Sequence, residues 1–177
     1  CLDPTPSRKA YLPPESKVLL DSGAFGDVRR GRMEFEGALA RQLKYETKNG
    51  FVSERIVSYD LLIDEQLDGN RQMKTRWNER RGWQAVRTTI AAAQYLAQKR
   101  ELLRPRQLVL CCQGVTTQQY VHCVEEIVSM GHGEACIWLG GWCIVGQQRH
   151  LAGLFWQTMR AILPIIAESF SSIHLFG

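Results

Sequence analysis

The chain has 177 residues, of which 45% are hydrophobic and 23% are charged, and its formal net charge is +4. These are ordinary values for a soluble globular domain. No stretch approaches the roughly 18 consecutive apolar residues of a membrane span, so we expect no membrane segment. The mild positive charge is compatible with a phosphate-rich partner but does not identify one.

The chain opens with a proline-rich stretch. Residues 1–16 contain Pro4, Pro6, Pro13 and Pro14, a composition that predicts an extended segment or loop. The remainder, residues 17–177, is predicted to form one domain. Its first apolar run, Val18–Leu20, is a candidate strand that ends at Asp21.

Four further strands are predicted from short runs of apolar or β-favouring side chains. They are residues 55–60, 108–113, 136–140 and 173–177. Apolar residues at helical spacing predict helices over residues 82–103, 120–128 and 151–166. We expect Pro105 to stop the first helix and Pro164 to kink or terminate the third. The charged stretch Glu65–Arg81 is predicted to be a flexible loop over the site or, equally, a nucleic-acid contact.

Short apolar strands followed by amphipathic helices indicate an α/β fold, with a parallel sheet covered by helices. A doubly wound sheet satisfies the same pattern. The position of the unusual residues favours a (β/α)8 TIM barrel, because they fall at the carboxyl ends of the strands, where barrel enzymes assemble their sites. No Gly-x-Gly-x-x-Gly follows the first strand, which argues against a Rossmann fold. About five of the eight strands are visible, and a complete barrel usually needs about 250 residues.

The six cysteines include no Cys-x-x-Cys pair, so their spacing predicts no zinc site. Several lie in apolar runs such as 108–112, where thiols behave as small buried hydrophobic groups. We therefore expect a reduced, cytoplasmic protein without disulfides.

The first candidate site follows the first strand. Asp21 offers a base or acceptor at a strand end, Ser22 and the following glycine leave backbone amides free, and Phe25 could stack on a flat ligand. The alternative interpretation is an ordinary turn in which Asp21 or Ser22 caps the next element.

Two further strand ends carry groups suited to a planar ligand. The Gln113 amide offers both a donor and an acceptor for the edge of a purine, and Gly114 lets a ligand approach the backbone. Gly140 and Gly141 end the next strand and could expose backbone donors and acceptors, and Trp142 is positioned to flank a bound base. Each glycine alone is more typical of a tight turn than of a ligand contact.

Read in order, these pieces resemble the tRNA-guanine transglycosylase superfamily. The segments that carry the resemblance are Asp21-Ser22-Gly23-Ala24-Phe25, Gln113-Gly114, Leu139-Gly140-Gly141 and His174-Leu175-Phe176-Gly177. Other details are more similar to the branch that inserts 7-deazaguanine bases into DNA: Gly31-Arg32, Gln113-Gly114 with Tyr120 and Cys123 downstream, and Cys143 before Gln147-Gln148. Gly26, which follows the first motif, stands where the tRNA enzymes usually carry Gln.

The resemblance implies specific roles. Asp21 would contact the base and handle protons, and Asp60, with Asp64 as the competing assignment, would recognise the guanine edge. Gln113 and the backbone of Gly140 and Gly141 would complete base recognition. The reaction would be a double displacement through a covalent enzyme–nucleic acid intermediate, after the base is flipped out of the stack. The partners would be DNA, or alternatively tRNA, and a 7-deazaguanine base.

The chain lacks two parts of this family's pattern, the first barrel strand and the nucleophilic Asp. The nucleophilic Asp and any zinc segment would lie beyond Gly177, and no cofactor is identifiable within the chain, so we expect that the chain is incomplete. A non-catalytic barrel subunit that binds nucleic acid or a catalytic partner is a second hypothesis. An unrelated α/β hydrolase or lyase is a third. A homo- or hetero-oligomer is compatible with each of them.

Overall fold

A computed structural model describes residues 4, 12–13, 15–24, 27, 34–66, 74–142 and 149–175. Its centre is a sheet of five parallel strands. These are β1 (Leu19–Leu20), β2 (Arg55–Val57), β5 (Gln107–Cys112), β6 (Cys136–Leu139) and β7 (Ser172–Leu175). Each of the five predicted strands is therefore confirmed, and so is the α/β class.

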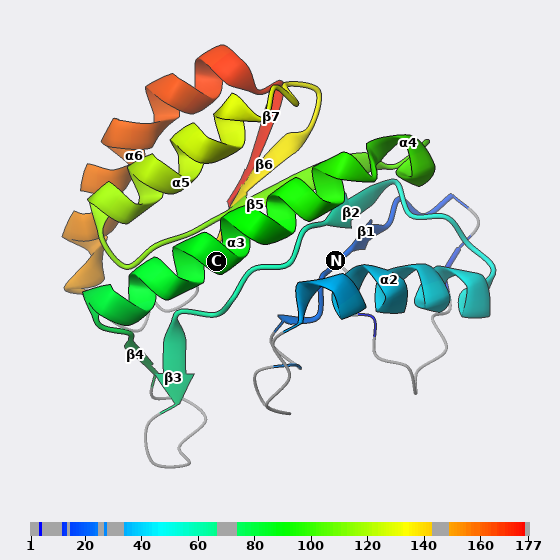
Figure 1. Cartoon of the computed structure of the whole chain (residues 1–177), viewed down its shortest axis with the longest axis horizontal. Helices are drawn as coiled ribbons and strands as arrows, with labels where there is room; N and C mark the ends of the chain where they lie inside the picture. Colours follow the sequence, from blue (N-terminus) through cyan, green and yellow to red (C-terminus); the bar gives the residue numbers. More distant parts are fainter. Residues whose placement is uncertain are drawn as a thin grey trace.

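The strands lie side by side in the order in which they occur along the chain, β1-β2-β5-β6-β7. A doubly wound sheet reverses its strand order part-way, at the point where it binds ligands. The described strands show no such reversal. Each strand of the sheet instead lies beside the one before it, always on the same side (Figure 1).

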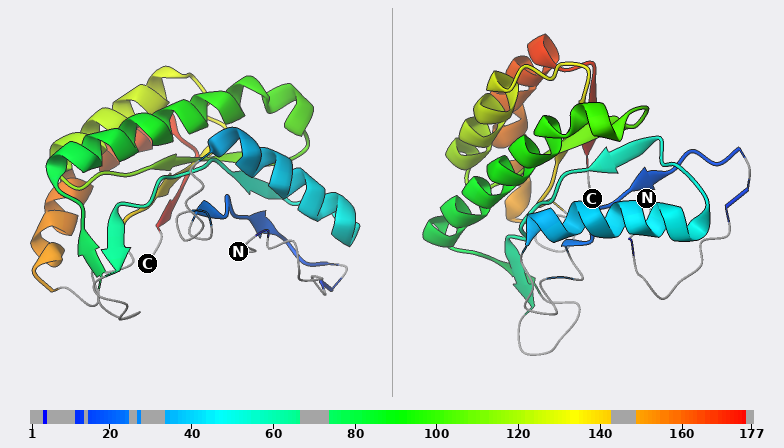
Figure 2. Two further views of the ribbon diagram at one scale, coloured as in Figure 1. Left: turned by 60° about the horizontal axis from the view of Figure 1, so that its bottom comes forward. Right: turned by 45° about the vertical axis from the view of Figure 1, so that its right-hand side comes forward.

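The helices all contribute to one face of the sheet (Figure 2). They are α2 (Phe35–Asn49), α3 (Glu79–Gln98), the short α4 (Arg100–Leu103), α5 (Thr117–Ser129) and α6 (Leu151–Ser169). Their apolar residues form one buried cluster with Ile56, Leu110 and Ile137 of the strands. Because strand side chains alternate between faces, their neighbours Val57, Val109, Cys111 and Trp138 form a second cluster on the opposite face.

Local signals account for several helix ends. Asn78 Oδ1 accepts a hydrogen bond from the Arg81 backbone N–H at 3.0 Å and caps the start of α3. Thr116 caps α5 in the same way through Gln119 N. Helix α2 ends at Gly50, whose φ of 70° lies in the left-handed region.

Three predictions about elements need correction. The stretch predicted as a flexible loop contains an antiparallel pair, β3 (Asp64–Gln66) and β4 (Lys74–Arg76), and α3 begins at Glu79. This hairpin projects beyond the sheet (Figure 1). The helix predicted over 82–103 is divided at Lys99 into α3 and α4. Pro164 does not terminate α6, which continues to Ser169.

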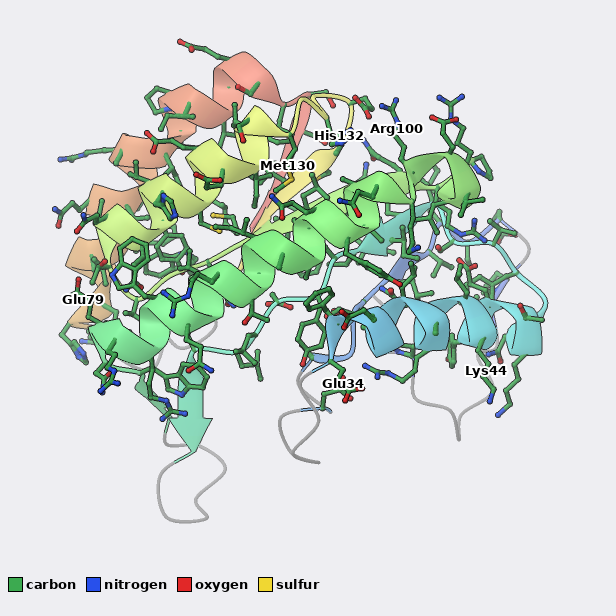
Figure 3. All side chains as sticks on the ribbon, in the orientation of Figure 1. Glu34, Lys44, Glu79, Arg100, Met130 and His132 are labelled. Atoms are coloured by element: carbon green, nitrogen blue, oxygen red, sulfur yellow. The ribbon has the colours of Figure 1, made fainter. Side chains whose placement is uncertain are left out.

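The amino ends of the strands are held by charged groups. Arg106, just before β5, forms an ion pair with Glu46 of α2 at 2.6 Å, and Ser53 donates to the same carboxylate. Burial opposes ionisation of Glu46, but the hydrogen bonds from Arg106 and Ser53 outweigh it and hold its pKa below the ordinary value. Nearby, Arg100 pairs with Glu134 at 2.9 Å, on the side where Figure 3 labels Arg100 and His132.

Within the described ranges, no helix is both long enough and apolar enough to cross a bilayer.

Candidate functional site

The candidate site lies at the carboxyl edge of the sheet. Asp21, Asp60, Gln113 and Gly140 follow β1, β2, β5 and β6 respectively. Because neighbouring parallel strands end at the same edge, these four residues come from adjacent positions along it. Gln42 of α2, 1% exposed, fastens two of these ends together, since its Nε2 donates to the Leu20, Asp21 and Val57 carbonyls at 2.9–3.2 Å.

Asp21 and Asp60 are joined through Ser22. The Ser22 backbone N–H donates to Asp21 Oδ1 at 2.7 Å, and the Ser22 hydroxyl lies 3.4 Å from Asp60 Oδ1 as a donor. The same hydroxyl accepts from Ala24 N at 3.3 Å. Ser22 is fully buried, so its hydroxyl is a fixed part of the structure between two carboxyl groups.

The surroundings of Asp60 oppose its ionisation. Burial, and then the negative charge of Asp21, raise the pKa of Asp60 from 3.8 to about 7. The Ser22 hydrogen bond favours the ionised form and offsets part of this shift. A carboxyl with a pKa near neutrality can exchange a proton with a substrate at physiological pH.

Gln113 lies beside this pair and is 1% exposed. Its Nε2 donates to the Leu61 carbonyl and to Thr89 Oγ1, the latter at 2.9 Å. Its Oε1 is buried and has no hydrogen-bond partner among the described residues. A Cβ built on Gly140 would lie 3.2 Å from Asp60 Oδ2 and 3.7 Å from Gln113 Oε1. Asp60, Gln113 and Gly140 therefore meet at one point.

The Gly140 backbone is already hydrogen-bonded within the protein. Its N–H donates to the Cys112 carbonyl at 2.9 Å, and its carbonyl accepts from the Tyr120 hydroxyl at 2.7 Å. The N–H therefore bonds within the sheet and is unavailable to a ligand. The sequence had predicted that it would donate to the base. The carbonyl retains a second lone pair.

Gly141 and Gly114 are required by close packing. Gly141 has a φ of 81°, and a Cβ there would approach Ile63 Cδ1 to 2.6 Å and the Tyr120 hydroxyl to 2.7 Å. At Gly114 a Cβ would lie 2.7 Å from Gln119 Cβ. Both glycines let α5 approach the strand ends that carry the site.

Trp142 is part of the helix-side core, 4% exposed. Its ring stacks on Tyr120 at 4.9 Å and meets Phe155 edge-on at 5.1 Å. The structure therefore gives Trp142 a packing role. Phe25, the other predicted aromatic contact, lies outside the described residues, as do residues 26, 31–32, 143, 147–148 and 176–177.

The positions of Asp64 and His174 separate them from the residues of the candidate site. Asp64 belongs to the β3–β4 hairpin, paired with Arg76, whereas Asp60 lies at the sheet edge with Ser22. Asp60 is therefore the better candidate for a base-recognising carboxylate. His174 lies on the sheet face opposite the helices, where its ring contacts Trp138 at 4.8 Å. Within the described ranges, no group of three or more His, Cys, Asp or Glu side chains could hold a metal ion.

Sequence reasoning did not find three residues that organise the edge. Gln42 holds the ends of β1 and β2, Thr89 holds Gln113, and Tyr120 holds Gly140. Each is at most 1% exposed and lies on a helix. A polar residue on the apolar face of a helix is the one signal that could have identified Gln42 and Thr89, because a buried polar group needs a partner.

Tyr59 completes the polar groups at this edge. It is 2% exposed, and its hydroxyl has no hydrogen-bond partner within the part of the chain that the structure describes. Burial, and then the charges of Asp27 and Asp60, raise its pKa, so the phenol stays protonated. Asp27 itself is buried and paired with Arg41 of α2.

Comparison of the sequence with protein-family models and with curated proteins finds no match. The geometry of this edge and the resemblance of the short motifs that form it are the features that bear on function.

Proposed function

We propose that this chain is the base-recognising part of an enzyme that exchanges guanine for a 7-deazaguanine base in DNA. The observation that carries the proposal is the meeting of Asp21, Asp60 and Gln113 beside Gly140 at the carboxyl edge of the sheet. These are the residues to which the motif resemblance assigns base contact and proton transfer. They are separated by up to 92 residues in the sequence, from 21 to 113.

The topology supports a barrel as the complete fold. Five parallel strands follow each other in chain order, and the helices α2 to α6 cover one face of the sheet. A sheet of this kind closes into a barrel when further strand–helix units are added in the same direction, with its site at the carboxyl edge. The proposed complete fold is a (β/α)8 barrel, to which the described strands contribute five.

The proposed chemistry divides the work between the two carboxyl groups. Asp21 is the acid and base that transfers the proton as guanine leaves and the new base enters. Asp60 and Gln113 hold the purine edge. The motif resemblance assigns the covalent bond to C1′ to a further Asp, and it assigns recognition and proton transfer to the residues of this edge.

The test uses full-length protein and two substrates. Full-length protein is incubated with DNA or, separately, with tRNA, together with an isotope-labelled 7-deazaguanine, and the nucleosides are analysed by mass. We expect label in DNA. Label in tRNA alone would show that tRNA is the substrate instead of DNA. Label in neither would overturn the proposal.

An Asp21→Asn variant tests whether Asp21 is the acid and base of the reaction. We expect incorporation to fall by a factor of about 100 or more, because general acid–base groups typically contribute 10²–10⁴-fold. Glu54→Gln, which removes an exposed carboxyl paired with Lys17, is the matched control and should keep full activity. Undiminished turnover in Asp21→Asn would refute the role of Asp21.

A further inference from the structure

Helix α3 and the two residues after it concentrate positive charge. Residues 80–100 contain five Arg or Lys and no Asp or Glu, whereas the net charge of the whole chain is +4. The five cations are Arg80, Arg81, Arg87, Lys99 and Arg100. This one segment therefore carries as much positive charge as the surplus of the whole chain, and a local field of this kind attracts polyanions.

The cations at the carboxyl end of α3 have partners within the protein. Lys99 Nζ lies over the Tyr95 ring, 4.8 Å from its centroid. Arg100 forms an ion pair with Glu134 at 2.9 Å. The positive charge that is available to a ligand therefore lies toward the beginning of the helix.

Arg80 and Arg87 form a stripe with Gln84 on the exposed side of α3. The three residues are spaced i, i+4, i+7, so they share one helix face, and all three are exposed. Neither arginine forms an ion pair with another described residue. Seven residues of helix separate them by about 10 Å along the axis. About three steps along one strand of a duplex cover the same distance, so the two arginines can contact two phosphates of one strand.

Arg81, next to this stripe, is held in place by Trp77. Its guanidinium lies over the Trp77 ring, 4.0 Å from the centroid. The Trp77 backbone N–H donates to the Ile63 carbonyl at 2.8 Å, which anchors the residue to the segment that follows β2. Stacking holds a guanidinium by its flat face, whereas phosphate is recognised by N–H groups in its plane. A pre-positioned arginine of this kind loses little side-chain freedom when it binds a phosphate.

The start of α3 lies at the same edge of the sheet as the candidate site. The Glu79 carbonyl accepts from Gln119 Nε2 at 2.9 Å. The Gln119 Oε1 accepts from the backbone N–H of Val115, two residues after Gln113, at 2.8 Å. Figure 3 labels Glu79 at this end of the helix. A nucleic acid strand that contacts the arginines therefore passes beside the site residues.

We infer that Arg80, Arg87 and the Trp77–Arg81 pair bind the phosphate backbone of the nucleic acid next to the target base. This inference rests on the proposed function and adds the surface that holds the substrate. Contacts from arginine side chains to phosphate oxygens position a duplex without reading its sequence. Their strength depends on the release of counterions, so binding through this surface should weaken steeply as salt is added.

The test measures binding of a fluorescent DNA duplex of arbitrary sequence to full-length protein over a range of NaCl concentrations. In Arg80→Gln and in Arg87→Gln, we expect the slope of log K against log salt to become less steep by about 0.9, the value for one phosphate contact of duplex DNA. Near about 0.1 M salt, each variant should bind roughly 3- to 10-fold more weakly. Glu79→Gln removes a carboxyl group beside Arg80 and should bind about 2-fold more tightly.

Lys44→Gln is the matched control, because Lys44 is an exposed cation on α2, away from this stripe (Figure 3). It should change the affinity by less than about 2-fold. Arg81→Lys keeps the charge but loses the planar fork, and should weaken binding by about 2- to 5-fold. Thermal unfolding of each variant at the wild-type temperature would show that the fold is retained.

Wild-type affinity and slope in both Arg80→Gln and Arg87→Gln would overturn the inference, and the proposed function would stand if label still enters DNA. An equal loss in Lys44→Gln would also overturn it, because the attraction would then come from net charge alone. Polyglutamate that competes equally with DNA at the same charge concentration would show that the surface recognises acidic chains in general. Wild-type protein that binds neither DNA nor tRNA would overturn both the inference and the proposed function.

Discussion

Asp60 is the residue on which pH acts most directly. It shares an edge with a second carboxyl, Asp21, and the Ser22 hydroxyl lies between them. Two nearby carboxyl groups in different environments separate their proton affinities, a recurring arrangement in acid–base sites. Here burial and the neighbouring charge both act on Asp60, which therefore holds its proton to about pH 7.

Replacing Asp60 by Asn should stabilise the fold at high pH. The folded-state pKa of Asp60, about 7, is above its ordinary value of 3.8, so ionisation costs the folded state more than the unfolded state. The cost is absent below the lower value, grows as pH rises, and is complete above the higher one. We expect Asp60→Asn to raise the free energy of unfolding by roughly 1–3 kcal/mol at about pH 8.5, after allowance for partial solvent access, and by much less at about pH 4.5.

Denaturant titrations of both proteins at the two pH values would measure this difference. Glu54→Gln, at the surface, should show no such pH dependence. A stability gain that is the same at both pH values would mean that Asp60 is already ionised at low pH.

The site residues differ in how far sequence could predict them. Asp21, Asp60 and Gln113 were identifiable because each directly follows a β-favouring run, and strand ends of a parallel sheet share an edge. Thr89 and Tyr120 were not, because they lie in helices where only the tertiary contact distinguishes a functional polar group from an ordinary one. Trp142 was interpreted as a core or rim residue that could also flank a base, and its packing against Tyr120 agrees with the first part, whereas the base contact stays a prediction.

At the scale of elements, the end of β6 is held unusually close to α5 and to the segment after β2. Gly141 makes this possible, since a Cβ at this position would meet Ile63 and the Tyr120 hydroxyl. Tyr120 in turn holds the carbonyl of Gly140. These contacts fix the position of the end of β6 and so place Gly140 beside Asp60.

Gly141→Ala should therefore destabilise the protein more than Gly50→Ala. Both glycines have φ values in the left-handed region, but a Cβ at Gly50 would meet nothing within 4 Å. We expect Gly50→Ala to cost about 1–2 kcal/mol from backbone strain alone. Gly141→Ala adds overpacking, for a total of roughly 2–5 kcal/mol. Equal losses in thermal or denaturant unfolding would contradict the close approach.

Most elements were predictable because their apolar residues follow a clear period. Helix α2 was missed, since polar residues dominate its sequence and only Ala38, Leu39 and Tyr45 supply buried apolar groups. The β3–β4 hairpin was missed because three-residue strands of charged and polar residues carry no periodic signal. Pro164 lacks a backbone N–H, yet α6 passes through it because packing against α5 outweighs one lost hydrogen bond.

For the molecule as a whole, the two edges of the sheet have different roles. The amino edge carries the buried Glu46–Arg106 pair, in which each charge is compensated. The carboxyl edge carries Asp60 and Gln113 Oε1, which are costly to bury. The proposed site thus contains buried polar groups that reduce stability, whereas the Glu46–Arg106 pair at the amino edge supports the fold.

Burial of the thiols is a property of the whole fold. Cys111, Cys112, Cys123 and Cys136 are free and buried, two on each face of the sheet. In a variant in which Cys1 and Cys143 are replaced by Ser, we expect these four thiols to react with a thiol reagent at least about 100-fold more slowly than in guanidinium chloride, because access requires unfolding. Rapid reaction of any one in the native protein would show that its face opens locally.

The alternation of side chains along β5 has a consequence for how this sequence can change. Leu110 and Cys112 face the helices, Val109 and Cys111 face away, and Gln113 takes the next position at the site. Deleting one residue from this strand would exchange the two sets and carry Gln113 away from Asp60 in a single step. Evolutionary drift in this protein should therefore alter the identity of residues in β5 freely, and its length almost never.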